Sequence, residues 1–143
     1  MATVVRCGDG NGAVTASGMM NLTIASSAES SGDLLIGEGD FTGVMTWNSS
    51  GTLEAQGRLR IGQGGTGVFN QTGGVVSAGI ADGSLRFLGI GVDPLSVGTY
   101  NLDAGVLRPG GGLAATQFRQ ILVGDNGATG SLNVGNNVGA LAS

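Results

Sequence analysis

A loosely repeated phrase is the feature of this 143-residue chain that most limits how it can fold. An apolar residue, any residue, a second apolar residue and a glycine recur five times. The copies are Val5-Arg6-Cys7-Gly8, Leu34-Leu35-Ile36-Gly37, Leu59-Arg60-Ile61-Gly62, Leu88-Gly89-Ile90-Gly91 and Ile121-Leu122-Val123-Gly124. Their glycines lie 29, 25, 29 and 33 residues apart. A pattern that returns every 20 to 50 residues or so, at roughly regular intervals, is typical of stacked repeat architectures.

Two further apolar groups follow each copy of the phrase. The first is a pair of residues separated by one position, a spacing that places both side chains on one face of a β-strand. Only Gln71 is polar among these pairs, which are Val14 and Ala16, Met45 and Trp47, Phe69 and Gln71, Tyr100 and Leu102, and Leu132 and Val134. The other group is Met19-Met20, Leu53, Val75-Val76, Val106-Leu107 and Val138. Each copy therefore predicts three short strands.

Each strand must find its partner in the neighbouring copy, because no copy has the spacing of a helix that could cover a sheet. The turns between strands are rich in Gly, Asn, Asp and Ser, which accept the positive φ angles of tight corners. Stacked copies would place like side chains in columns about 4.8 Å apart. We therefore expect an all-β fold, a parallel β-helix (β-solenoid) of about five coils with roughly three short strands per coil. One domain is expected over residues 1–143, with 1–33 as an irregular first coil and 34–138 as the clearest repeats.

Residues 59–76 combine the repeated phrase with further glycines and alternating apolar residues. This pattern resembles the glycine-rich β-strand repeats of autotransporter passenger domains and of related exported bacterial surface proteins. The resemblance covers roughly residues 34–138 and, more weakly, 5–33. It implies a parallel β-helix at a cell surface, where such repeats serve as adhesins, scaffolds or carriers of enzymes. Extracellular or cell-surface localisation is the corresponding expectation.

Three segments carry the extra length of the repeats, namely 22–33, 77–84 and 108–119. Insertions in stacked repeats form loops on one face, and loops on a rigid scaffold are where binding residues gather. We expect these segments to be connecting loops. The sequence pattern leaves open whether any of them binds a ligand.

The composition excludes several kinds of chemistry. The chain has no His and no Lys, which removes the most common general base, the most common metal ligand and the amine of Schiff-base catalysis. The net charge is −4 and the six Arg form no cluster, so no nucleic-acid partner is expected. No stretch approaches the ~18 apolar residues of a membrane span. Cys7 is the single cysteine, and its place in the repeat predicts a small buried apolar residue.

Acidic residues follow the first strand of several copies. That position holds Asp9, Glu38, Gln63, Val92 and Asp125, and stacked carboxylates there would suit acid–base catalysis or a cation. The interruptions at Gln63 and Val92 favour a solvated edge instead. Residues 8–22 faintly match a calcium loop, but Ala13 and Met20 stand where oxygen ligands are needed. We assign no catalytic, cofactor-binding or metal-ligating residue and expect no cofactor.

Threonines and aromatic residues also recur at equivalent positions. Thr42, Thr66 and Thr129 would order water if they formed an unbroken ladder, but Asn11 and Val97 take that place in the other copies. Hydroxyls that cap local turns are the simpler interpretation. Outward-facing aromatic rings would stack on sugars, whereas the inward-alternating column predicts core positions for Trp47, Phe69 and Tyr100.

Asn and Arg side chains are expected to have ordinary surface roles. Asn-x-Ser/Thr triplets, which are glycosylation acceptors in exported proteins, begin at Asn21, Asn48 and Asn70 and are expected by chance in this composition. Ion pairs of small energetic value are predicted between neighbouring coils. They would join Arg58, Arg60, Arg86 and Arg108 to Glu38, Glu54, Asp82 or Asp103.

Neither end of the sequence has the polar pattern of a solenoid cap. Counting from Gly124 to Gly8 of a second molecule gives 27 residues, within the range of the internal spacings. We hypothesise that copies stack head to tail, because such a contact that does not close on itself produces a filament. An excised part of a longer repeat protein explains the same ends, and the sequence leaves both readings open.

The leading functional hypothesis is a non-enzymatic, self-associating extracellular β-solenoid that forms a fibre or surface assembly. One alternative is a carbohydrate- or surface-binding module of an adhesin or phage fibre. A β-helical polysaccharide-degrading enzyme is disfavoured, because the chain lacks His and Lys and its acidic column is interrupted.

Overall fold

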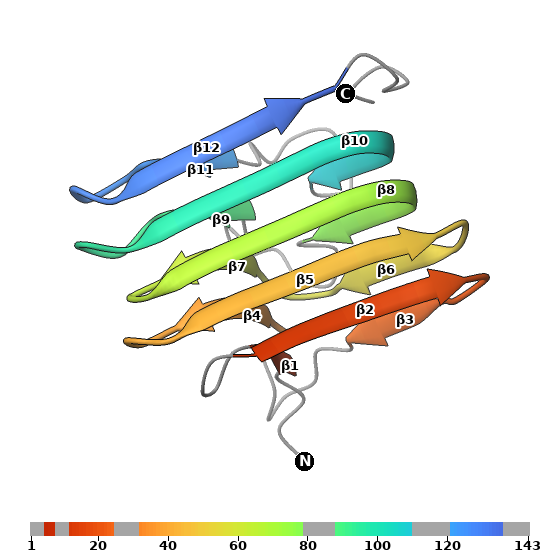
Figure 1. Cartoon of the computed structure of the whole chain (residues 1–143), viewed down its shortest axis with the longest axis horizontal. Helices are drawn as coiled ribbons and strands as arrows, with labels where there is room; N and C mark the ends of the chain where they lie inside the picture. Colours follow the sequence, from red (N-terminus) through yellow and green to blue (C-terminus); the bar gives the residue numbers. More distant parts are fainter. Residues whose placement is uncertain (1–4, 8–11, 25–31, 79–87, 110–120, 136–143) are drawn as a thin grey trace.

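The computed structural model describes residues 5–7, 12–24, 32–78, 88–109 and 121–135. Over these residues the chain is all-β, and none of them belongs to a helix long and apolar enough to cross a membrane. Figure 1 shows the strands stacked in successive layers. The described strands are β1 (Val5–Cys7), β2 (Gly12–Gly18), β3 (Leu22–Ile24), β4 (Leu34–Glu38), β5 (Thr42–Ser49), β6 (Thr52–Ala55), β7 (Leu59–Gln63), β8 (Thr66–Ala78), β9 (Leu88–Ile90), β10 (Val97–Pro109), β11 (Ile121–Val123) and β12 (Thr129–Val134).

Parallel pairing joins these strands into two sheets. The first has the order β1-β4-β7-β9-β11, and the second has the order β12-β10-β8-β5-β2. Strand β6 pairs with both β3 and β8 and so extends the second sheet. All pairings between the named strands are parallel. Because neighbours in each sheet come from successive repeats, the predictions of an all-β chain and of parallel pairing between repeats are confirmed.

The register of both sheets follows the columns seen in the sequence. In the first sheet Ile61 lies between Ile36 and Ile90. In the second sheet the column that starts at Val14 continues through Met45, Phe69, Tyr100 and Leu132. The parallel column starts at Ala16 and continues through Trp47, Gln71, Leu102 and Val134. A shift of one residue would turn each column to the opposite face, so the apolar pattern specifies this register.

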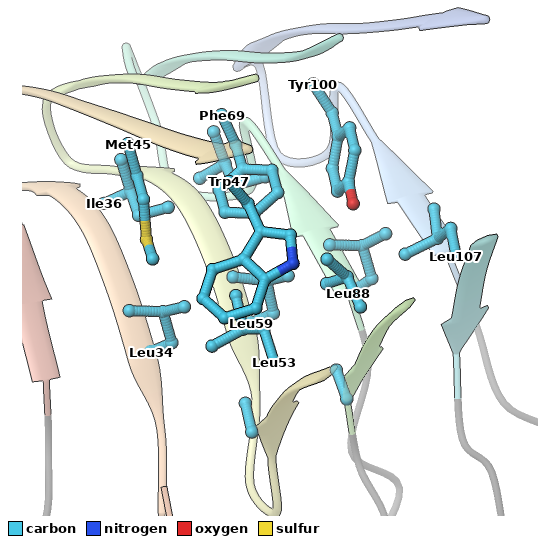
Figure 2. Packing of buried hydrophobic residues seen from close by; sticks show 14 of the residues in the cluster. Leu34, Ile36, Met45, Trp47, Leu53, Leu59, Phe69, Leu88, Tyr100 and Leu107 are labelled. Carbon is cyan, nitrogen blue, oxygen red and sulfur yellow. The ribbon is translucent and has the colours of Figure 1, made fainter. Parts of the chain in front are cut away.

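The core lies between the two sheets and is built from these inward columns. Trp47, Phe69 and Tyr100 are fully buried, and the first sheet contributes Leu34 and Leu59 from the opposite side. The Phe69 and Tyr100 ring centroids lie 4.9 Å apart at an interplanar angle of 54°. Figure 2 shows the Trp47 ring among aliphatic side chains of this cluster. The three aromatic residues therefore occupy the core positions that the sequence predicts.

Glycines form the corner between the first and second sheets. Gly62, which follows Ile61, has a φ of 75°, and the equivalent Gly91 has a φ of 63°. These left-handed conformations disfavour residues with a Cβ. A Cβ at Gly62 would also collide with the carbonyl oxygen of Val97, which lies in the next layer. The repeated glycine is thus required both by the turn and by the close approach of successive layers.

The division into three strands per repeat holds in some layers and not in others. The second and third expected strands are separate in the two layers nearest the first described residues, but β8 and β10 each run through both positions over 13 residues. Figure 1 shows β8 and β10 curving back at this edge of the sheet. The register explains the difference, because Trp47 to Thr52 spans one residue more than the paired segment from Gln71 to Val75. The extra residue interrupts pairing, whereas the shorter corner at Gly74 keeps the strand continuous.

The predicted third strand of the first repeat and the predicted starts of all three insertions are wrong. The third strand of the first repeat is Leu22–Ile24, with Leu22 opposite Leu53, and not Met19-Met20, which lie in the preceding turn. Residues 22–24 therefore do not belong to a loop. Ser77 and Ala78 likewise lie in β8, and Arg108 and Pro109 lie in β10. Gly32 and Asp33, the last residues of the first predicted insertion, lie outside any strand, as expected of a loop. Residues 25–31, 79–84 and 110–119 of the three insertions fall outside the described residues, as does Val138.

Candidate functional site

Among the described residues, two ion pairs join arginines to partners that the sequence does not predict. Arg58 binds Asp33 through two nitrogens, with Nε at 3.0 Å and Nη2 at 2.7 Å from Oδ2, and the Arg58 backbone N–H donates to Oδ1 at 2.7 Å. Asp33 is buried, so this charge-assisted contact holds the start of β7 against the start of β4. Arg60 Nη1 lies 3.8 Å from Asp93 Oδ2. Arg86 and Asp82 lie outside the described residues.

Within the described residues, the acidic column places its side chains in different surroundings. Glu38 lies opposite Gln63, Val92 is buried, and Asp125 is exposed at the turn after β11. Asp9 and Asn11 are not among the described residues. Among the residues that are described, no three His, Cys, Asp or Glu side chains gather in a position to hold a metal ion. Cys7 lies opposite Ile36 in the backbone register of β1 and β4.

The predicted threonines occupy equivalent positions in the sheet, but a valine interrupts their column. Thr42 lies opposite Thr66, and Val97 lies between Thr66 and Thr129. All four residues begin strands directly after the turns that connect the two sheets. The hydroxyl row is therefore broken by the valine, as the sequence indicates.

A buried polar network explains the single Gln in the apolar column. Gln71 is fully buried, and its Nε2 donates to the carbonyl oxygens of Gly73, Gly74 and Val106 at 3.2 to 3.3 Å. Its Oε1 accepts a hydrogen bond from the Tyr100 hydroxyl at 2.6 Å. This network joins the layer of β8 to the layer of β10 and binds the tight corner at Gly73 and Gly74. Gln71 therefore has a structural role. The sequence signal was the one polar residue in an otherwise apolar column.

Burial raises the pKa of the Tyr100 phenol well above its ordinary value of 10.0. The folded state therefore holds the proton more tightly than the unfolded chain does. We expect the free energy of unfolding contributed by this group to be complete below about pH 10 and to decrease as the pH rises further. Urea unfolding between about pH 8 and about pH 11 in a Cys7→Ser background, with Tyr100→Phe for comparison, measures this dependence.

Tyr100 is the only tyrosine, which makes the comparison direct. Tyr100→Phe is expected to flatten the decrease and to lower stability by about 1 to 3 kcal/mol at neutral pH, because Gln71 Oε1 loses its donor. Equal slopes in the two proteins above pH 10 would contradict the assignment.

An unpredicted ladder of amides crosses the second sheet. Asn101 Nδ2 donates to Asn70 Oδ1 at 2.7 Å, and Asn133 Nδ2 donates to Asn101 Oδ1 at 2.8 Å. The three residues are paired in register on β8, β10 and β12. Below them in the same column stand Thr46 and Thr15. The sequence feature that could have predicted this ladder is the recurrence of Asn at one position of the repeat. We interpreted Asn70 only as the start of an Asn-x-Ser/Thr triplet.

Asn21 and Asn48 also bind across layers. Asn21 Oδ1 accepts from the Thr52 backbone N–H at 2.9 Å, and Asn48 Oδ1 accepts from the Thr72 hydroxyl at 2.9 Å. All three asparagines of the predicted triplets therefore use their amide oxygens to connect one layer to the next.

The outermost strands of the stack expose apolar positions that are buried elsewhere in the same columns. Val14 on β2 is 48% exposed and Val134 on β12 is 51% exposed. The residues that continue their columns on the inner strands β5, β8 and β10, such as Phe69 and Leu102, are at most 3% exposed. Val123 on β11 is likewise 44% exposed. Over the described residues, β2 pairs only with β5, and β12 pairs only with β10, so each presents a strand edge.

These two edges are the candidate functional site. Unpaired strand edges are templates for pairing with another chain, and natural proteins protect them with charges, prolines or covering segments. Neither β2 nor β12 contains a charged residue or a proline. Comparison of the chain with protein-family models, with curated proteins and with solved structures finds no match.

Proposed function

We propose that this chain is a parallel β-solenoid of about five coils that acts as a non-enzymatic structural protein and stacks head to tail with copies of itself. The main observation in support is that Val14 and Val134 are exposed, whereas the residues of their columns on β5, β8 and β10 are buried. Placing β2 of one copy on β12 of another would add the same parallel contact that already joins successive layers. A fibre or surface assembly outside the cell is the setting that the resemblance to exported repeat proteins favours.

A charge placed in the apolar column tests this function. We expect the wild-type protein to grow in size with concentration by sedimentation velocity and to form filaments in electron micrographs. Val134→Lys should raise the dissociation constant of the contact by about a hundredfold or more, because an unpaired ammonium would be buried between copies. Leu95→Lys is the matched control, since Leu95 is a 90% exposed apolar residue in the turn before β10, away from both edges.

Circular dichroism establishes that each variant is folded before its size is measured. Leu95→Lys should assemble as the wild type does. A wild-type protein that stays monomeric at all concentrations, or a Val134→Lys protein that assembles normally, would overturn the proposal.

A second function is favoured by the outward face of the second sheet. Before the corner of this sheet, its outward positions carry mostly Thr, Ser and Asn, including Thr46, Asn70 and Asn101, and Asp103 is the one charged side chain there on the described strands. Beyond the corner, Glu54 on β6 and Arg108 on β10 are charged. A surface with few charges and many hydrogen-bonding side chains suits the hydroxyls of carbohydrate. A glycan array tests this binding function, and the aromatic residues of the core take no part in it because they are buried.

A further inference from the structure

The amide ladder has a direction. In each step the upper Asn donates through Nδ2 and the lower Asn accepts through Oδ1, first from Asn133 to Asn101 and then from Asn101 to Asn70. The Oδ1 atoms of Asn70 and Asn101 therefore each accept from the layer above, on the β12 side. Such in-register amide ladders are a recurrent stabilising feature of stacked parallel strands.

The ladder ends in an open acceptor at the β12 edge. Asn133 is exposed, and no donor within the described residues reaches its Oδ1. At the opposite edge of the stack, the same column ends at Thr15 on β2, which is also exposed. A threonine hydroxyl can donate one hydrogen bond, so the two ends of the column are chemically complementary.

We infer that Asn133 and Thr15 fix the register and polarity of the contact between copies, with the Thr15 hydroxyl of one copy donating to Asn133 Oδ1 of the next. This inference rests on the proposed head-to-tail association. The register that joins these two residues also places Val14 over Leu132 and Ala16 over Val134, which continues both apolar columns. The polar and apolar requirements therefore select the same alignment.

Other alignments lose one of these contacts. A shift of one residue would turn the apolar side chains of β2 outward. A shift of two residues in one direction would place Asn133 opposite Ala13, which has no donor in its side chain, and Leu132 opposite Gly12. The same shift in the other direction would keep a hydroxyl, that of Ser17, opposite Asn133, but it would place Val134 opposite Gly18 and so interrupt that apolar column. A contact between two β12 edges would offer only Asn133 acceptors to one another. The ladder thus favours head-to-tail stacking, in which all copies point the same way, over a dimer in which two β12 edges meet.

Disulfide trapping tests the register without altering the ladder. In a Cys7→Ser background, Ala13→Cys with Ser131→Cys places one thiol on each edge, at residues that are opposite in the inferred alignment. Paired residues on adjacent parallel strands have Cα atoms about 4.8 Å apart, within the range of disulfides. The matched control, Ala13→Cys with Thr129→Cys, is displaced by two residues and has a separation of about 8 Å. Within one molecule, three layers lie between the two edges, so a disulfide must join different copies.

We expect the Ala13/Ser131 cysteine pair to form disulfide-linked multimers at least about tenfold faster than the Ala13/Thr129 pair. In the parent protein, Asn133→Ala and Thr15→Val should each weaken assembly about fivefold, and the double variant no more than either alone, because both remove the same hydrogen bond. Failure of the parent to assemble would overturn the proposed function. Normal assembly with equal cross-linking of the two cysteine pairs, or with additive losses in the double variant, would overturn the register alone.

Discussion

Gly98→Ala is expected to lower the free energy of unfolding by about 3 kcal/mol or more, a large part of the ~5 to 15 kcal/mol typical of a folded domain. Gly98 is the second residue of β10, and its backbone needs no unusual φ. The effect is instead steric. A Cβ at this position would collide with the Ile61 carbonyl oxygen of the layer below and with the Gly91 backbone nitrogen of its own layer. Neither group can move without breaking the sheet pairing that it makes.

Chemical denaturation of the purified variant measures this loss. Gly135→Ala is the matched control, because its nearest contact would be Asp103 Cα at 3.3 Å, and a loss below about 1 kcal/mol is expected there. Gly67, the residue opposite Gly98 in β8, meets the same kind of backbone contact and should behave as Gly98 does. If Gly98→Ala and Gly135→Ala had equal stability, the close approach of the layers would be wrong.

Trp47→Ala should cost about 3 to 5 kcal/mol, because it opens a cavity in the middle of the core. The Trp47 side chain is fully buried between Ala16 in the layer below and Gln71 in the layer above. Its Nε1 has no hydrogen-bond partner, so nearly all of its contribution comes from packing. Neither Ala16 nor Gln71 can fill the space, since Ala16 is too small and Gln71 is held by its own hydrogen bonds.

Trp47→Phe keeps the prediction testable if the alanine variant does not fold. It should lose about half as much stability, because a smaller ring still fills part of the site. Phe41→Ala is the control for removal of an aromatic ring, since Phe41 is 43% exposed in a turn and should cost no more than about 1 kcal/mol. Thermal and urea unfolding followed by circular dichroism measure all three proteins. A Trp47→Ala protein as stable as Phe41→Ala would contradict the core assignment.

The sequence predicts the columns of side chains correctly because the spacing of nearby residues determines them. A residue pair such as Met45 and Trp47 has the period of a strand, and the glycine after each first strand marks a corner, so both are visible in the sequence. The third strand of the first repeat is predicted at the wrong residues, because Met19-Met20 and Leu22 are all apolar and Met20 lies only two residues before Leu22. The length of the corner decides between them, and the pairing of Leu22 with Leu53 sets that length.

The candidate site, too, is only partly predictable from the sequence. The repeat identifies Val14 and Val134 as members of inward columns, and therefore as residues that should be buried. Their exposure follows from their place in the outermost described strands, which depends on the order of the whole stack. The ion pair of Arg58 with Asp33 joins residues 25 positions apart whose strand starts meet only after stacking.

By itself, the sequence determined that the chain is all-β, that its repeats pair in parallel, and which side chains form the columns. These properties follow from a period of two within strands and from glycines at fixed places, which act over a few residues. Only the tertiary structure decided which residues meet between layers: the Tyr100 and Gln71 hydrogen bond, the Asn ladder, and the exposed edges at β2 and β12. Contacts between layers depend on the length of every corner along the chain, so a single residue added or lost changes partners that lie far apart in sequence.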